Sequence, residues 1–89
     1  MNNIQIINQQ GDELNVELIF SFNCPDTQKN YVALDNKNNI FEPTSRYSNI
    51  DIFEITKIKG KNIYITDIPS SEWEIVKRAL QFNVFAKMN

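Results

Sequence analysis

Histidine is absent from this chain of 89 residues, and cysteine occurs once, as Cys24. Without histidine the chain lacks the commonest general base near neutral pH, so neither Cys24 nor any serine can form the Cys–His or Ser–His pair of a nucleophilic enzyme. The same shortage removes the ligands that zinc prefers, and a lone cysteine excludes an intramolecular disulfide. We therefore predict a noncatalytic protein that uses no metal and no cofactor.

Glycine is scarce as well. Gly11 and Gly60 stand alone and neither opens a helical segment, so no phosphate-binding loop or small-molecule substrate is indicated. Residues 35–39 resemble the start of a calcium loop, but Lys37 occupies a ligand position and Ile40 stands where the loop needs glycine. We interpret this segment as part of a polar loop, residues 35–49.

Long apolar runs are also missing. No stretch approaches the ~18 residues of a membrane span, and residues 1–5 lack the basic and apolar regions of a secretory signal. We expect a cytoplasmic location and no membrane contact. The formal net charge of −2 comes from interspersed acids and bases, which argues against a general nucleic-acid surface. At this length a single domain, residues 1–89, is expected.

Alternating apolar residues dominate the first two thirds of the chain. The clearest run is Leu14, Val16, Leu18, Phe20 and Phe22, whose period of two predicts a strand with one buried face. In residues 50–58 the apolar phase shifts, which indicates a bulge or burial on both faces. Turn residues separate the runs. The predicted strands cover about residues 3–8, 13–23, 30–35, 50–58 and 62–67.

The period changes to 3.6 after Ile68 and Pro69. Ser71 and Glu74 have the spacing of a capping box, and neither glycine nor proline interrupts residues 71–89, so a helix is predicted over about residues 71–87. Strands first and one helix last favour the α+β class. We expect an antiparallel β-meander of four to five strands packed against a single C-terminal α-helix.

The predicted helix has two apolar stripes. One contains Trp73, Val76, Leu80 and Val84 and can pack on the sheet. The other, which we name as a possible partner surface, contains Ile75, Ala79, Phe82 and Ala86. Our hypothesis is a protein-interaction or regulatory module that forms a homodimer or binds a protein partner through this second stripe. Two alternatives are that residues 35–49 fold over the stripe, or that an exposed apolar surface is tolerated.

A basic hairpin supports a second hypothesis. Lys57, Lys59 and Lys61 surround a turn close to Tyr64, and lysines beside an aromatic ring can bind single-stranded RNA. Lysine on a strand edge also discourages edge-to-edge aggregation, and we favour that interpretation. A small nucleic-acid-binding module is therefore the alternative function.

Three ordered segments resemble a known family. They are residues 16–22 (VELIFSF), residues 29–34 (KNYVAL), and Ile68-Pro69 followed by residues 72–76 (EWEIV) and Phe82. Together they resemble the YrzB-like family of small bacterial proteins, a domain of unknown function, although this chain is less acidic than is typical there. The resemblance implies a cytoplasmic bacterial protein and brings no catalytic residues.

Overall fold

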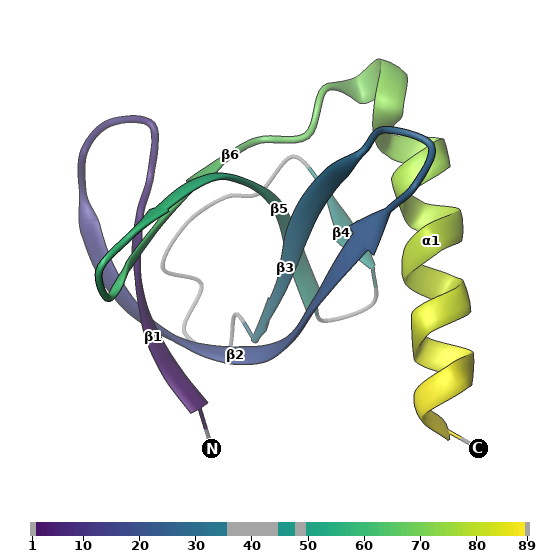
Figure 1. Ribbon diagram of the computed structural model, residues 1–89, viewed down its shortest axis with the longest axis horizontal. Helices are drawn as coiled ribbons and strands as arrows, with labels where there is room; N and C mark the ends of the chain where they lie inside the picture. Colours follow the sequence, from purple (N-terminus) through teal and green to yellow (C-terminus); the bar gives the residue numbers. More distant parts are fainter. Residues whose placement is uncertain (1, 36–44, 48–49, 89) are drawn as a thin grey trace.

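The alternating segments of the sequence form a sheet that curls around and closes on itself (Figure 1). The computed structural model describes residues 2–35, 45–47 and 50–88, and the ranges below belong to these. The elements are β1 (Asn2–Ile7), β2 (Glu13–Cys24), β3 (Lys29–Asp35), β4 (Arg46–Tyr47), β5 (Ile50–Lys59), β6 (Asn62–Thr66) and α1 (Ser70–Met88).

The predicted meander with one C-terminal helix is confirmed, and long-range pairing adds to it. The strand order is β3-β2-β1-β6-β5-β4, with a further pairing of β3 to β5 that completes a ring of five strands. Neighbours in the ring are antiparallel except β1 and β6, which run parallel over three residue pairs between Gln5–Ile7 and Asn62–Tyr64. β4 lies outside the ring, beside the start of β5. The result is a small barrel.

Turn chemistry sets the hairpins. In the β1–β2 loop, the Asn8 side-chain oxygen accepts bonds from the amides of Gln10 (3.0 Å) and Asp12 (2.9 Å), which fixes the loop as an Asx turn. Gly11 and Gly60 have φ values of 86° and 62°, the left-handed region in which a side chain is strained. These two glycines therefore form the β1–β2 and β5–β6 turns.

The inside of the barrel holds one hydrophobic core, which we call the interior core. It receives side chains from all five strands of the ring. All of them are buried on the face of the sheet that does not contact the helix. The buried members are Ile6, Val16, Val32, Leu34, Phe53 and Ile65.

A second core, the outer core, lies between the outside of the barrel and α1. Its rings are in contact, with centroids 5.9 Å apart for Phe20 and Phe22 and 5.4 Å apart for Phe22 and Tyr31. The helix thus covers an aromatic face of the sheet. The buried members are Phe20, Phe22, Cys24, Tyr31, Ala33, Ile52, Ile68, Val76 and Leu80.

A β-bulge at Ile19 divides the long strand β2 between the two cores. Leu18 pairs with Leu34 and Phe20 pairs with Ala33, so two steps along β2 match one step along β3. Since Leu34 and Ala33 face opposite sides of the sheet, Leu18 and Phe20 do too. The period of two predicted that the alternating residues from Leu14 to Phe22 share one buried face. That prediction is wrong, because the bulge divides them between the two cores.

Strand β5 shows both features that its sequence indicated. Ile52 belongs to the outer core and Phe53 to the interior core, so the strand is buried on both faces. A register shift then occurs between Ile55 and Lys57. Beyond it the hairpin extends into solvent, where Ile58 is 64% exposed.

The start of β5 is anchored by β4. The fully buried carboxylate of Asp51 accepts a hydrogen bond of 2.9 Å from Nε of Arg46, its cross-strand partner. The amide of Ile52 donates to the carbonyl of Ser45 at 3.1 Å. Within the part of the chain that the structure describes, no helix is long and apolar enough to cross a membrane.

The bulge gives the first testable outcome. Deletion of Ile19 leaves Leu18 and Phe20 on opposite faces of a regular strand, so we expect a folded protein that loses about 1–2 kcal/mol with the bend. Deletion of Ser21 instead turns Phe22 and Cys24 out of the outer core, and we expect at least about 4 kcal/mol to be lost. Urea unfolding followed by fluorescence measures both. Equal losses would contradict the assigned role of the bulge.

Candidate functional site

The exposed side of α1 forms the candidate site. Phe82 is 75% exposed and Ile75 is 36% exposed, and seven residues, or about two turns, separate them on one face of the helix. Glu74 and Arg78 are exposed on the same face. We call these four residues the outer helix face. It presents two apolar side chains, Ile75 and Phe82. Arg78 lies between them along the helix, and Glu74 lies beside Ile75.

The structure places the sequence-predicted partner surface only partly on this face. Ile75 and Phe82 are on it, whereas Ala79 is half-buried and packs against the outer core. The side chains of Ala86 and Val84 lie outside the described residues, as do residues 36–44 and 48–49 of the predicted polar loop. Ala79 thus lies at the boundary between the two faces of the helix.

The opposite side of α1 fixes the helix on the barrel. Val76 and Leu80 have no exposed surface, and Trp73 packs against the outer core beside them. Burial of two such aliphatic side chains stabilises the docked helix by about 3–6 kcal/mol before entropy is counted. Asn83 adds a bond of 2.8 Å from Nδ2 to the carbonyl of Ala79. The outer helix face is therefore presented on a fixed scaffold.

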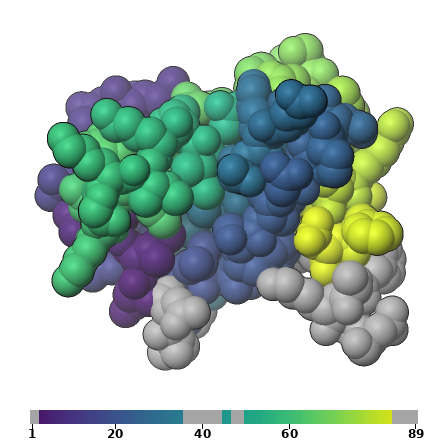
Figure 2. Space-filling model, viewed as in Figure 1, coloured from purple at the N-terminus to yellow at the C-terminus, as the bar shows by residue number. Residues whose placement is uncertain are grey.

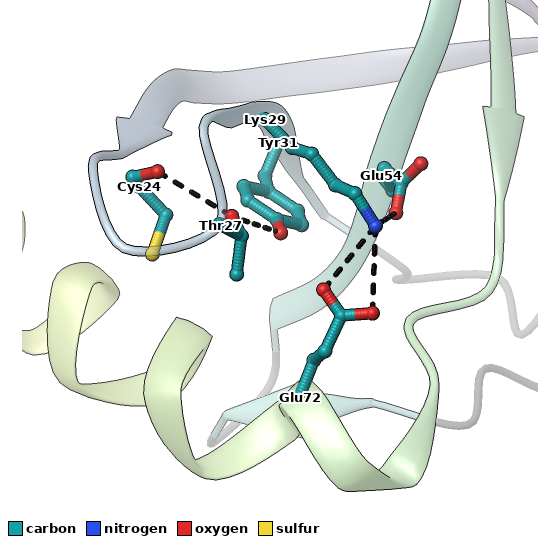
Figure 3. A network of polar contacts seen from close by, with 6 residues as sticks. All are labelled: Cys24, Thr27, Lys29, Tyr31, Glu54 and Glu72. Atoms are coloured by element: carbon teal, nitrogen blue, oxygen red, sulfur yellow. Dashed lines mark hydrogen bonds and ion pairs between the residues drawn. The ribbon is translucent and has the colours of Figure 1, made fainter.

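An ion-pair cluster joins the N-terminal end of α1 to two strands (Figure 3). Lys29 Nζ, from the start of β3, lies 3.3 Å from Glu54 Oε1 on β5 and 3.2 Å from Glu72 Oε1 in the first turn of α1. A second contact to Glu72 Oε2 measures 3.4 Å. The hydrogen bonds that Lys29 donates to Glu72 and Glu54 raise its pKa above the usual 10.5. The cluster acts as a polar clamp between helix and barrel, which we call the Lys29 clamp.

A hydroxyl pair lies next to the clamp (Figure 3). The Tyr31 hydroxyl is 2.8 Å from Thr27 Oγ1, which is itself 3.4 Å from the carbonyl oxygen of Cys24. Each of the two hydroxyls can donate or accept in this pair. Burial raises the pKa of Tyr31 above its usual 10.0, and the Thr27 bond opposes this. Cys24 is buried in the outer core. These contacts hold the β2–β3 turn, and they expose no nucleophile.

The basic hairpin is exposed but partly self-satisfied. Lys57, Lys59 and Lys61 are all exposed, and Lys57 Nζ lies 4.4 Å from the centroid of the Tyr64 ring. A base could stack on that face of the ring only after Lys57 moved. Lys57 pairs with Tyr64 across the strands, Tyr64 pairs with Ile7, and Ile7 pairs with Glu13. The carboxylate of Glu13 therefore lies three strand spacings, ~14 Å, from Lys57 across the sheet. The positive surface is therefore narrow.

Among residues 2–35, 45–47 and 50–88, no three His, Cys, Asp or Glu side chains come together as a metal site. Comparison with protein-family models, with curated proteins and with solved structures found no match to this chain.

Sequence reasoning missed the Lys29 clamp. Lys29 and Glu72 are 43 positions apart, and Glu54 comes from a third segment, so no local spacing announces the cluster. The only signal was that Glu72 lies in the first helical turn, where an acid is favourable.

The Lys29 clamp makes stability depend on alkaline pH. The raised pKa values of Lys29 and Tyr31 mean that folding is favoured when each group is protonated. Their contribution to the free energy of unfolding is complete below about pH 10 and is lost as pH rises through the folded pKa values. We expect the free energy of unfolding of Lys29→Met to be lower than that of the wild type near neutral pH, with a difference that shrinks above about pH 10.5. Urea unfolding across this range measures it.

Lys77→Met is the matched control, because Lys77 forms an exposed pair of 3.1 Å with Glu74 on the helix surface. Its effect is expected to be small, below about 0.5 kcal/mol. If Lys29→Met matched this control at every pH, the clamp would have no stabilising role.

Proposed function

We propose that this protein is a noncatalytic protein-binding module and that the outer helix face is its contact surface. One observation carries the proposal: Phe82 is three-quarters exposed beside Ile75 on a helix whose other side is fixed by the outer core and the Lys29 clamp. Preorganised aromatic side chains are the usual anchors of protein interfaces.

The chemistry of the outer helix face favours a protein partner. Burying Phe82 in a partner pocket would contribute about 1.5–3 kcal/mol. Glu74 and Arg78 add one charge of each sign at the border of the patch, which favours a partner, or a second copy, with a complementary pair. Membership of the YrzB-like family and a cytoplasmic location stay predictions that rest on the sequence motifs.

Replacement of Phe82 tests the proposal. Phe82→Glu removes the anchor and places a charge at the contact, so we expect partner capture, or self-association measured by sedimentation, to weaken at least about tenfold. The fold should persist, because an exposed site changes stability by no more than about 0.5 kcal/mol.

Ile58→Glu is the matched control, since Ile58 is 64% exposed on the β5–β6 hairpin. Figure 2 shows this hairpin (green) and the C-terminal part of α1 (yellow) at opposite sides of the molecule. Binding lost equally in both variants would exclude a specific role for the outer helix face.

The nucleic-acid hypothesis keeps one supporting observation, which is that Lys57, Lys59 and Lys61 are exposed together. It is the weaker proposal because Lys57 covers the Tyr64 ring and because only three cations are available.

Salt dependence distinguishes this alternative. Three lysines that each neutralise one phosphate would give log K a slope of about −2 against log salt for a single strand. Fluorescence anisotropy with labelled oligo-U, at low and at physiological salt, measures the slope, and a variant with all three lysines changed to glutamine should lose the binding. No binding at low salt would end the hypothesis.

A further inference from the structure

A cleft opens at the end of the barrel where the β1–β2 loop and the end of β6 meet. Its volume is about 240 Å³. Two interior-core side chains, Phe53 and Ile65, provide its apolar part, and the remaining described lining residues are polar: Asn8, Gln9, Gln10, Thr66 and Asp67. We call this cleft the barrel mouth. Mouths of β-barrels are common places for binding sites.

Asp67 distinguishes the barrel mouth chemically. It is the one charged residue among the described lining residues, and it is half-buried. No side chain of the described ranges forms an ion pair or hydrogen bond with it, whereas Asp12, Glu13, Glu54 and Glu72 each have a partner. The Asp67 carboxylate is acceptor-only and can therefore accept hydrogen bonds from a ligand in the cleft.

The loop wall opposite Asp67 is already ordered. The Asn8 side chain binds the amides of Gln10 and Asp12, and its own amide lies 3.4 Å from Asp12 Oδ2. The side chains of Gln9 and Gln10 are exposed and make no bond within the described ranges. Their amide oxygens can therefore accept hydrogen bonds from a ligand.

Asp67 also borders a second cleft of about 370 Å³, lined on its far side by Pro69, Ser70 and Trp73. That cleft lies at the N-terminal end of α1, where the helix dipole is positive and disfavours cations. The barrel mouth is therefore the more favourable of the two clefts for a cationic ligand of Asp67.

We propose that the barrel mouth receives an arginine side chain of a partner protein. The guanidinium group has five donors in one plane, which suit the Asp67 carboxylate and the two glutamine amide oxygens. Its weak hydration suits a site with an aromatic wall, here Phe53. The cleft is below the ~300–1,000 Å³ of sites for drug-sized ligands, so its size fits one side chain. This contact is separate from the outer helix face and does not depend on it.

Peptide titration tests the proposal on the full chain. The probes are acetyl-Gly-Gly-X-Gly-Gly-amide peptides in which X is arginine, lysine or citrulline, the uncharged isostere of arginine, and free agmatine is the small-molecule arm. Amide chemical shifts in heteronuclear NMR spectra report the binding site. We expect the arginine peptide to shift residues 8–10 and 66–67 with a roughly millimolar Kd, and citrulline to bind at least about tenfold more weakly.

Two variants separate charge from shape. Asp67→Asn should weaken the arginine peptide about tenfold, whereas Asp26→Asn should leave it unchanged, because Asp26 is an exposed acid in the β2–β3 turn without a partner in the described ranges. The proposal would be overturned if the citrulline and arginine peptides bound equally, or if the lysine peptide bound more strongly than the arginine peptide. It would also be overturned if the shifts occurred at other residues, or if agmatine bound and the capped arginine peptide did not. Because the citrulline arm uses the unmodified protein, a folding defect of Asp67→Asn would not protect the idea.

Discussion

The structure depends on β3 being buried on both sides. Tyr31 and Ala33 fill the outer core while Val32 and Leu34 fill the interior core, and all four have at most 1% of their surface exposed. A strand with two buried faces can lie only between two packed layers. The barrel alone supplies one layer, so α1 must supply the other. The helix and the barrel therefore pack as one unit, and the Lys29 clamp lies at the edge of the contact between them.

This constraint explains where the two proposed binding surfaces lie. Because Val76 and Leu80 of α1 are buried in the outer core, the helix can offer a partner only the side that carries Ile75 and Phe82. The barrel mouth lies where the β1–β2 loop follows β1 and Asp67 follows β6. Both proposed binding surfaces therefore lie at the margins of the two cores.

Local pattern predicted the local structure well. Strand periods and the change of period after Pro69 predicted the five longer strands and the helix, because hydrophobic periodicity reports which side chains are buried. The helix begins at Ser70, one residue before the predicted cap at Ser71. The bulge at Ile19 left no trace, since apolar residues two apart satisfy one core or two equally well. Closure of the ring and the position of Asp67 depend on pairings such as Gln5 with Asn62, and sequence spacing does not encode such distant partners. At the candidate site, Phe82 is exposed and Ala79 is half-buried, and the role of both residues in binding stays a prediction.

The parallel seam between β1 and β6 also has a consequence for synthesis. It joins Gln5–Ile7 to Asn62–Tyr64, so the ring cannot close on the ribosome until more than two thirds of the chain has emerged. Until then β1 and β2 exist as a hairpin whose interior face is exposed, and an isolated hairpin is marginally stable in water. Contacts of such large sequence separation also slow folding. Ile6 and Val16 can therefore reach their place in the interior core only after Asn62–Tyr64 have been synthesised.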